Sequence, residues 1–380
     1  MPQQLKTDKT LFATTVIMVF FGLVMIYSAS SVMAMEDPRY HSTTYFVLRQ
    51  AIWVLPALLV MMFFKRLRYL KLQNPMVAFP AIGLMIILLL VVYFSDPKNH
   101  RWLRLGILNI QPSEIAKPAI VIFLAYFVTQ RARAINSRHT IWPAIMSVGL
   151  LTFGVAVADL GTAVVIGVTG AVVFFVAGLQ RRYCAVLLAA ALLGGSIFIA
   201  SKPYRLIRVV QFFDPGYKIT DQIDTHGYLR GYLSQSMAPR DANYQLLQAQ
   251  IAVASGGPLG LGPMQGKQKL LYLPEPHTDC IYAVICEEMG MFGSLGVLAA
   301  FCMILWRGLR ATFRVEDEFG RYLALGITTM VVVQAFMNMS VVLGLAPTKG
   351  IPLPMLSFGG NSLLSTLALL GMLMNVSENA

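Results

Sequence analysis

The chain has 380 residues, of which 57% are hydrophobic and only 13% are charged, and its formal net charge is +12. A soluble domain carries about 25% charged residues, so this composition excludes an ordinary soluble protein and indicates a membrane protein. The basic surplus does not require a nucleic-acid partner, because basic residues collect in the cytoplasmic loops of membrane proteins. The cysteines show no paired spacing and are typical of helix packing.

About ten apolar segments follow one another along the chain, and several approach or exceed the roughly 18 residues that cross a bilayer, while several others are short. The first has the basic flank and small residues of a signal peptide, but the many later segments favour a retained first helix. We therefore predict an all-α polytopic membrane protein in which residues 1–380 form a single transmembrane domain. The segments are 11–30, 46–64, 76–95, 115–130, 141–158, 162–179, 184–201, 279–306, 321–344 and 361–376.

Loop charges predict the orientation. The short basic loops "KRLRYLK", "QRARAINSRH", "LQRRY" and "RGLRATFR" follow every second segment. The positive-inside rule places these loops and both termini in the cytoplasm. The large loop 202–278, between the seventh and eighth segments, is then extracytoplasmic. Within it, "YRLIRVVQFF" alternates basic and apolar residues like an interfacial helix, and "YQLLQAQIAVA" is apolar again.

Charged groups on the predicted outer side are functional candidates, because charges in or against lipid are costly. Asp279 in "HTD" stands at the mouth of the eighth segment, where it is either a helix cap or a catalytic carboxylate. The spacing of Glu114 and Lys117 allows a buried ion pair. Together with Arg101 and Arg104 just upstream, Lys117 alternatively suits an anion site for a phosphate.

Other outer groups have equally open interpretations. Asp159 in "DLGT" is a candidate buried partner for Lys117 or an arginine, and Arg49 either snorkels to the interface or binds an anionic headgroup. Prolines and glycines break any helix in "GLAPTKGIPLPMLSFGGNSLLS". One interpretation is a plain turn between two helices. The other is a cavity lining, because non-helical backbone at membrane depth is tolerated only when it is buried in protein or lines a wet cavity. The cavity candidates here are Lys349, Ser357 and Asn361.

Glu287 and Glu288 lie inside the eighth apolar segment, where an unpaired carboxylate would be the most costly feature of the chain. We interpret them as part of helix–helix structure. The residues alone thus predict an outward-facing, cation-rich cavity with one or two carboxylates, suited to an anionic lipid or a phosphorylated substrate. They do not separate an enzyme from a transporter.

Six motifs in chain order resemble the SEDS family (shape, elongation, division and sporulation), from the first helix to the last. They are "IYSASSVMA", "RWLRLGILNIQPSEIAK", "DLGT", "YQLLQAQIAVASGGPLGLG", "KLLYLPEPHTDCIYAVICEEMG" and "PTKGIPLPMLSFGGNS". Two of them lean towards the cell-division branch over the elongation branch. The resemblance implies a ten-helix peptidoglycan glycosyltransferase of the bacterial cytoplasmic (inner) membrane. It would polymerise lipid II on the extracytoplasmic side and release undecaprenyl diphosphate.

The resemblance also implies roles and partners. Asp279 is the expected catalytic carboxylate, acting as a general base. The predicted substrate-binding residues are Arg49, Arg101, Arg104, Glu114, Lys117, Asp159, Lys349 and Ser357. No metal site is predicted, and a divalent cation (Mg²⁺ or Mn²⁺) is the one cofactor considered. The expected partners are a class B penicillin-binding protein transpeptidase of the FtsI type and division proteins of the FtsQ, FtsL and FtsB types.

Three alternatives stay open at this point. A lipid II flippase would also use broken helices and membrane-embedded charges, although no paired repeat is visible. A scaffold for division partners would not need the outer charges at all. An elongation-type polymerase would share the chemistry and differ in its cellular role.

Overall fold

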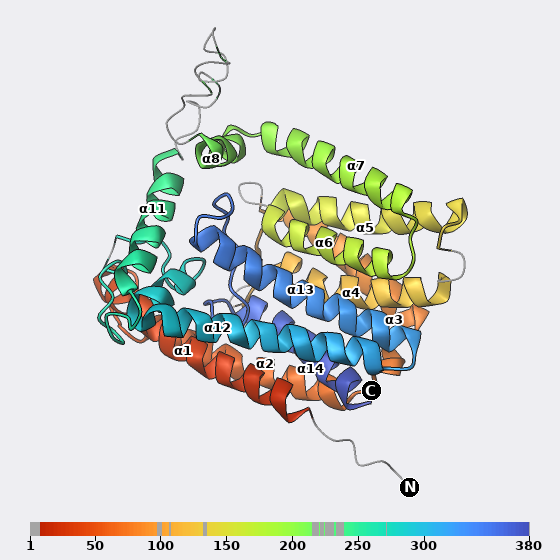
Figure 1. Ribbon diagram of the computed structural model, residues 1–380, viewed down its shortest axis with the longest axis horizontal. Coiled ribbons are helices and arrows are strands. Elements are labelled where there is room, and N and C mark those ends of the chain that lie inside the picture. The colour runs from red at the N-terminus through yellow and green to blue at the C-terminus, as the bar shows by residue number, and fades with distance from the viewer. Residues whose placement is uncertain are drawn as a thin grey trace.

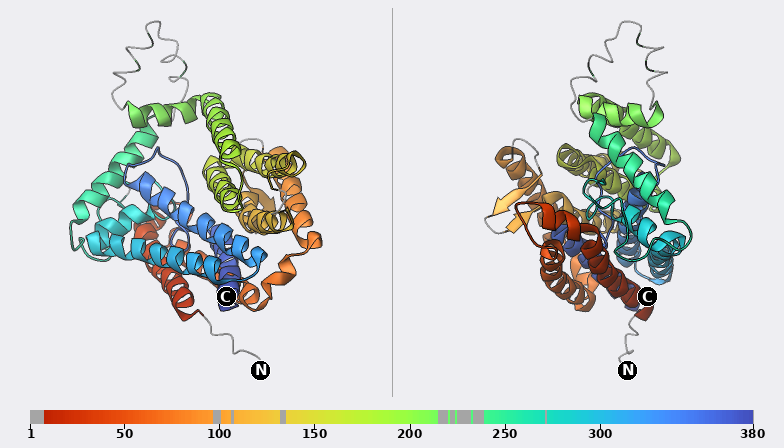
Figure 2. Two further views of the ribbon diagram at one scale, coloured as in Figure 1. Left: turned by 45° about the vertical axis from the view of Figure 1, so that its right-hand side comes forward. Right: turned by 90° about the vertical axis from the view of Figure 1, so that its left-hand side faces the viewer.

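The computed structural model describes residues 8–96, 101–105, 108–131, 135–214, 220, 224, 232, 239–270 and 272–379. This part of the chain is a helical bundle with one short β-hairpin (Figure 1). The helices are α1 (Lys9–Glu36), α2 (Tyr45–Arg66), η1 (Tyr69–Leu72), α3 (Pro75–Ser95), α4 (Pro112–Arg131), α5 (Arg138–Ala158), α6 (Leu160–Val176), α7 (Arg181–Ala200), α8 (Pro203–Phe213), α11 (Pro239–Gly256), α12 (Ile281–Arg314), α13 (Glu318–Val342) and α14 (Gly360–Glu378). The hairpin pairs β1 (Leu103–Leu105) with β2 (Leu108–Ile110), and it stands at the edge of the bundle (Figure 2).

Every predicted apolar segment falls on a helix, which confirms the all-α polytopic class. Among the described residues, eight helices are long and apolar enough to cross a membrane: α1, α2, α3, α4, α7, α12, α13 and α14. The apolar parts of α5 and α6 are shorter, at Ile145–Ala158 and Leu160–Val176. A count of ten spans therefore stays a prediction.

The core lies around α4, α13 and α14. Between 72% and 78% of the apolar stretch of each of these helices is buried, whereas none of α7 is. Figure 1 shows α7 along the outside of the bundle, joined to α8, with α11 leading back to α12. The predicted amphipathic segment forms α8, and "YQLLQAQIAVA" lies within α11. Most of 215–238, between these helices, lies outside the described residues.

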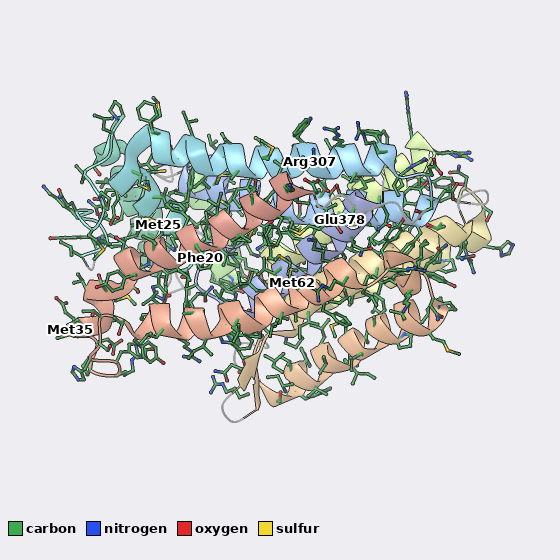
Figure 3. All side chains as sticks on the ribbon, turned by 90° about the horizontal axis from the view of Figure 1, so that it is seen from below. Phe20, Met25, Met35, Met62, Arg307 and Glu378 are labelled. Carbon is green, nitrogen blue, oxygen red and sulfur yellow. The ribbon has the colours of Figure 1, made fainter. Side chains whose placement is uncertain are left out.

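Polar contacts hold the predicted cytoplasmic end together. Asp8 caps α1 by accepting from the Leu11 amide at 3.1 Å, and it also pairs with Arg307 of α12 at 2.7 Å. The Ser377 hydroxyl of α14 donates to the same carboxylate at 2.8 Å. Figure 3 shows Arg307 and Glu378 close to the start of α1. These contacts fix one end of α12 and leave the opposite end to be positioned separately.

α12 is interrupted at Gly290, whose backbone (φ 63°, ψ −155°) is not helical. The interruption separates a short half-helix, 281–289, from the long remainder, and it leaves carbonyl groups without intrahelical partners. A glycine-rich loop, 257–270, supplies the missing partners: the amides of Leu261 and Gly262 donate to the carbonyls of Glu287 and Glu288, both at 2.9 Å. The Met291 amide donates in turn to the Gly257 carbonyl at 2.9 Å. The break is therefore closed by the loop.

The contact between loop and half-helix requires glycine at position 260. Gly260 has φ +81°, and a Cβ there would collide with the Glu288 carbonyl. Gly178 has a similar φ of +90° but nothing within 4 Å of its Cβ position, so it is a matched control. We expect Gly178→Ala to lower the free energy of unfolding by about 1–2 kcal/mol through backbone strain alone. Gly260→Ala should cost about 1–3 kcal/mol more through overpacking. Thermal unfolding in detergent measures both, and equal losses would contradict the close contact.

Candidate active site

The "HTD" turn places Asp279 directly ahead of the half-helix. Cys280 occupies the N-cap position of α12, and no described residue hydrogen-bonds to the Asp279 carboxylate. Of the two interpretations of Asp279, the structure therefore does not show the helix cap. The Asn338 amide of α13 donates to the Asp279 carbonyl at 2.8 Å and to the Ile351 carbonyl at 2.7 Å. One side chain thus joins the "HTD" turn to the loop between α13 and α14, while the Asp279 carboxylate stays available.

Further contacts fix the turn that carries Asp279. The Ser357 hydroxyl donates to the Thr278 carbonyl at 2.6 Å, and the Phe358 amide donates to the His277 carbonyl at 2.9 Å. The His277 ring packs in a cluster with Phe46 and Phe358, whose ring centroids lie 4.2 and 5.5 Å from its own. Burial in this aromatic environment lowers the pKa of His277 to about 4, so the ring is neutral at pH 7. His277 consequently packs the turn without adding a charge.

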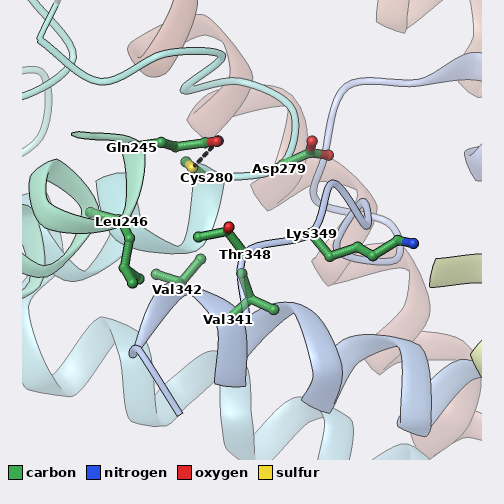
Figure 4. A pocket seen from close by; sticks show the side chains of 9 residues that line it. Gln245, Leu246, Asp279, Cys280, Val341, Val342, Thr348 and Lys349 are labelled. Atoms are coloured by element: carbon green, nitrogen blue, oxygen red, sulfur yellow. Dashed lines mark hydrogen bonds between the residues drawn. The ribbon is translucent and has the colours of Figure 1, made fainter. Parts of the chain in front are cut away.

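A small pocket lies beside Asp279, between α11, the end of α13, the "HTD" turn and the loop that joins α13 to α14 (Figure 4). In Figure 4 the side chains of Asp279 and Lys349 both extend on the side away from Gln245. Gln245 itself bonds the Cys280 sulfur at 3.2 Å. The pocket is lined by Gln245, Leu246, Ala249, Asp279, Cys280, Val341, Val342, Thr348 and Lys349. The charged ends of Asp279 and Lys349 therefore share one side of a mainly apolar pocket.

Burial sets the protonation behaviour of Asp279. It raises the pKa of the carboxyl to about 6, and the negative charges of Asp159 and Glu275 act in the same direction. The positive charges of Arg101 and Arg208 oppose the rise. Two arginines from different parts of the chain thus lie near enough for their charge to act on the carboxylate, and its pKa of about 6 leaves it mostly ionised at pH 7.

Lys349 has the opposite perturbation for the same reason. Burial lowers the pKa of its ammonium group to about 7, and three arginines (Arg205, Arg208 and Arg101) push it further down, while Asp159 opposes them. Lys349 and these arginines thus share one cation-rich region with Asp279. Such a region attracts an anionic ligand.

Asp159 pairs with Arg101, at 3.7 Å, which decides between the two partners expected for it. It also caps α6 by accepting from the Gly161 amide at 3.0 Å and from the Thr162 hydroxyl at 3.0 Å. The Arg101 Nε is buried and has no hydrogen-bond partner among the described residues. Arg101 therefore keeps donor capacity for a ligand.

Sequence reasoning missed two arginines of α8. Arg205 donates to the Tyr204 hydroxyl at 2.8 Å and lies over the Phe198 ring at 4.0 Å. Arg208 has a buried Nε without a hydrogen-bond partner in the described part of the chain. The sequence did contain a signal for them. The two arginines are three residues apart, so they lie on the same face of the helix and can act on one site together.

Glu114 and Lys117 form a deeply buried pair at 2.7 Å, and each is 1% exposed. The Lys117 ammonium group also donates to Gln334 at 2.8 Å, and Ser365 donates to Glu114 at 3.1 Å. Gln334 in turn donates to the Pro352 carbonyl at 2.8 Å. The pair thus supports the loop that carries Lys349. Its role in substrate binding stays a prediction.

The remaining predicted residues lie in different settings. Arg49 is exposed on α2 and donates to the Tyr45 hydroxyl at 3.1 Å, and Arg104 is exposed on β1. Ser357 is buried, and its hydroxyl also accepts from the Leu353 amide at 2.7 Å, so both of its contacts are structural. No three His, Cys, Asp or Glu side chains lie together as metal ligands in the described ranges.

The buried pair yields a stability prediction. Lys117→Met leaves Glu114 buried without its counter-charge, and we expect a loss of about 3–5 kcal/mol in the free energy of unfolding. Arg49→Met removes an exposed arginine and should change it by less than about 0.5 kcal/mol. Thermal unfolding in detergent compares the two. An unchanged melting temperature for Lys117→Met would argue against a structural pair.

These features define a polytopic membrane protein with a carboxylate and several cations at one end of a broken helix. Residues 8–380 match the family described as cell cycle protein, which groups FtsW, RodA and SpoVE, and the chain belongs to this family. A probable peptidoglycan glycosyltransferase FtsW from Geobacter metallireducens is 33% identical, with 97% of this chain and 94% of the relative covered. Stage V sporulation protein E from Bacillus subtilis is 32% identical, with coverage of 98% and 97%.

Solved structures agree with the family assignment. One similar chain belongs to a solved structure described as "Structural coordination of polymerization and crosslinking by a peptidoglycan synthase complex". It superposes with a TM-score of 0.75 at 26% identity, covering 98% of both chains. The rod shape determining protein RodA of Thermus thermophilus gives a TM-score of 0.65 at 24% identity, covering 99% of this chain and 98% of that one, and shows the same fold.

Proposed function

We propose that this chain is a peptidoglycan glycosyltransferase that polymerises lipid II into glycan strands for septal wall synthesis. The names of the FtsW relatives support the activity and the division role. The observation that carries the chemistry is Asp279: a half-buried carboxylate without a hydrogen-bonded partner in the described structure, in one pocket with Lys349 and within the electrostatic influence of Arg101. A reaction that removes a proton and expels a diphosphate needs both a base and cations.

Asp279 acts as the general base in this proposal. It takes the proton of the 4-hydroxyl group of the acceptor sugar, and the oxygen attacks the anomeric carbon of the lipid-linked donor. The glycosidic bond forms as the bond to the diphosphate breaks, and the single displacement inverts the anomeric centre. A pKa near 6 keeps Asp279 ionised at neutral pH and still basic enough to accept a proton.

The cations bind the leaving undecaprenyl diphosphate. Arg101 has an unpartnered buried Nε, and Lys349 has a free ammonium group in the pocket, so both can donate to phosphate oxygens. Their charge stabilises the negative charge that develops as the bond breaks. The described residues bring no set of three metal ligands together, so no step is assigned to a divalent cation.

The partner and the location follow the same proposal. The similar solved complex is a peptidoglycan synthase in which polymerisation and crosslinking are coordinated, which supports a class B penicillin-binding protein as the transpeptidase partner of this chain. Contacts with FtsQ, FtsL and FtsB types of protein belong to the division role. The basic loops support an inner-membrane orientation with cytoplasmic termini and an extracytoplasmic site.

Replacement of the base tests the proposal directly. Asp279→Asn keeps the shape of the side chain but cannot accept the proton, so glycan polymerisation from labelled lipid II should fall by about 10²–10⁴-fold. Glu275→Gln is the control, because Glu275 is an exposed carboxylate in the same turn. The assay uses the purified protein with its transpeptidase partner. Equal product from Asp279→Asn and wild type would remove Asp279 from the mechanism, and lipid II transport without any glycan would favour the flippase.

The pH dependence should be bell-shaped. The carboxylate form of Asp279 is lost as the pH falls through about 6, so the rate should fall on the acid side. The ammonium form of Lys349 is lost as the pH rises through about 7, so the rate should also fall on the alkaline side. Lys349→Arg keeps its charge and should remove the alkaline limb. A limb unchanged by Lys349→Arg would exclude Lys349 as its source.

A further inference from the structure

A buried polar cluster lies at the opposite end of the half-helix from Asp279, and the proposed chemistry makes no use of it. Its members are Ser28 of α1, Lys269 of the glycine-rich loop and Glu288 of α12. They are 3%, 2% and 1% exposed. The Lys269 ammonium group contacts Glu288 at 2.6 Å and Ser28 at 2.9 Å. Ser28 donates to the Glu288 carboxylate, with its two oxygens at 2.6 and 2.7 Å.

Both carboxylates of "EEMG" hold the same loop. Glu288 accepts from the Met264 amide at 3.0 Å. Glu287 accepts from the amides of Lys267 at 2.7 Å and Gln268 at 3.1 Å. The expectation of helix–helix structure for these glutamates is only partly right, since α1 contributes Ser28 but the loop contributes the other partners. The loop hydrogen bonds act at the point where α12 loses its own helical bonds.

Stability alone does not explain this arrangement. The side chains of Lys269 and Glu288 are 2% and 0% exposed, so forming the pair costs most of the hydration of both charges. Apolar residues of similar volume often stabilise a protein as well as such a pair does. What the ion pair adds is a fixed geometry among three segments, α1, the loop and α12, that no apolar contact specifies as narrowly.

The contacts around Asp279 hold the backbone of its turn and not its carboxylate. Asn338, Ser357 and Phe358 bond to backbone carbonyls there, and no described residue hydrogen-bonds to the carboxylate itself. The direction of the half-helix therefore also matters for the position of this group. The residues from Ile281 to Glu288 are all buried, so a shift at Glu288 is transmitted along the half-helix to Asp279. A displacement of about 1 Å at a reacting group can cost about 10²-fold in rate.

We propose that Ser28, Lys269 and Glu288 are positioning residues, which hold the half-helix so that Asp279 reaches the acceptor hydroxyl group. The inference rests on the proposed function, because the position matters only if Asp279 takes part in catalysis. The three residues lie away from the reacting atoms and would affect kcat only through the position of Asp279. None of the three residues needs to touch the substrate.

Glu288→Gln and Lys269→Met test the inference in the full chain with its transpeptidase partner. Each is expected to lower kcat for glycan polymerisation by about 10²-fold with KM changed less than about threefold, because the base moves and the binding cations do not. The acid limb of the pH profile should also shift, since the burial that raises the pKa of Asp279 depends on its position. Ser28→Ala removes one member of the cluster and should lower kcat by about tenfold.

The ion pair between Asp8 and Arg307 is the matched control. Its carboxylate is buried and its arginine is half-buried, and it also involves α12, but it lies at the predicted cytoplasmic end. Arg307→Met should lower the melting temperature and leave kcat per folded molecule and the pH profile unchanged. Should Glu288→Gln fail to fold, Ser28→Ala decides the outcome.

The outcomes separate this inference from the proposed function. A lower kcat and a shifted acid limb in the variants of the cluster, with kcat and the pH profile of Arg307→Met unchanged, support the positioning role. Wild-type kcat and an unshifted limb in folded Ser28→Ala and Glu288→Gln overturn the positioning role and leave the proposed function standing. Wild-type protein that makes no glycan with its partner overturns the proposed function, and the inference falls with it.

Discussion

The interruption of α12 at Gly290 is the constraint on which the rest of the site depends. Backbone groups inside a membrane must find partners within the protein, so a helix can break there only where another segment supplies them. The glycine-rich loop does so by bonding the carbonyls of Glu287 and Glu288. The break leaves a short half-helix ahead of Gly290, and Asp279 lies directly before this half-helix. The loop thereby supports the segment that carries Asp279.

Two kinds of buried charge follow from this arrangement. Lys117 and Lys269 have carboxylate partners and further hydrogen bonds, so their charges are satisfied inside the protein. Arg101 and Lys349 are half-buried and keep free donors. Because a desolvated cation without a full set of partners gains most from an anion, the second kind is the one suited to a diphosphate. Lys117, of the first kind, supports through Gln334 the loop that carries Lys349, of the second.

The sequence carried much of this, for physical reasons that can be named. Long apolar runs predict helices because the bilayer demands them, and every predicted segment is helical. Asp279 and Lys349 were found because a charge beside a membrane helix is costly and conspicuous. Arg205 and Arg208 were missed, since alternating basic and apolar residues also describe a surface helix. The partners of Glu288 were hidden as well, because Ser28 is 260 residues away along the chain.

The positions of the family motifs support a link between the active site and the buried polar cluster of Ser28, Lys269 and Glu288. Ser28 lies in "IYSASSVMA", while Lys269 and Glu288 lie in the stretch that contains "HTD", so the motifs behind the resemblance meet at both ends of the half-helix. Binding of substrate would explain the motif residues near Asp279 but not those at the far end. A requirement to place one carboxylate accurately explains both sets. The half-helix is then the functional unit, with its base at one end and its fixed support at the other.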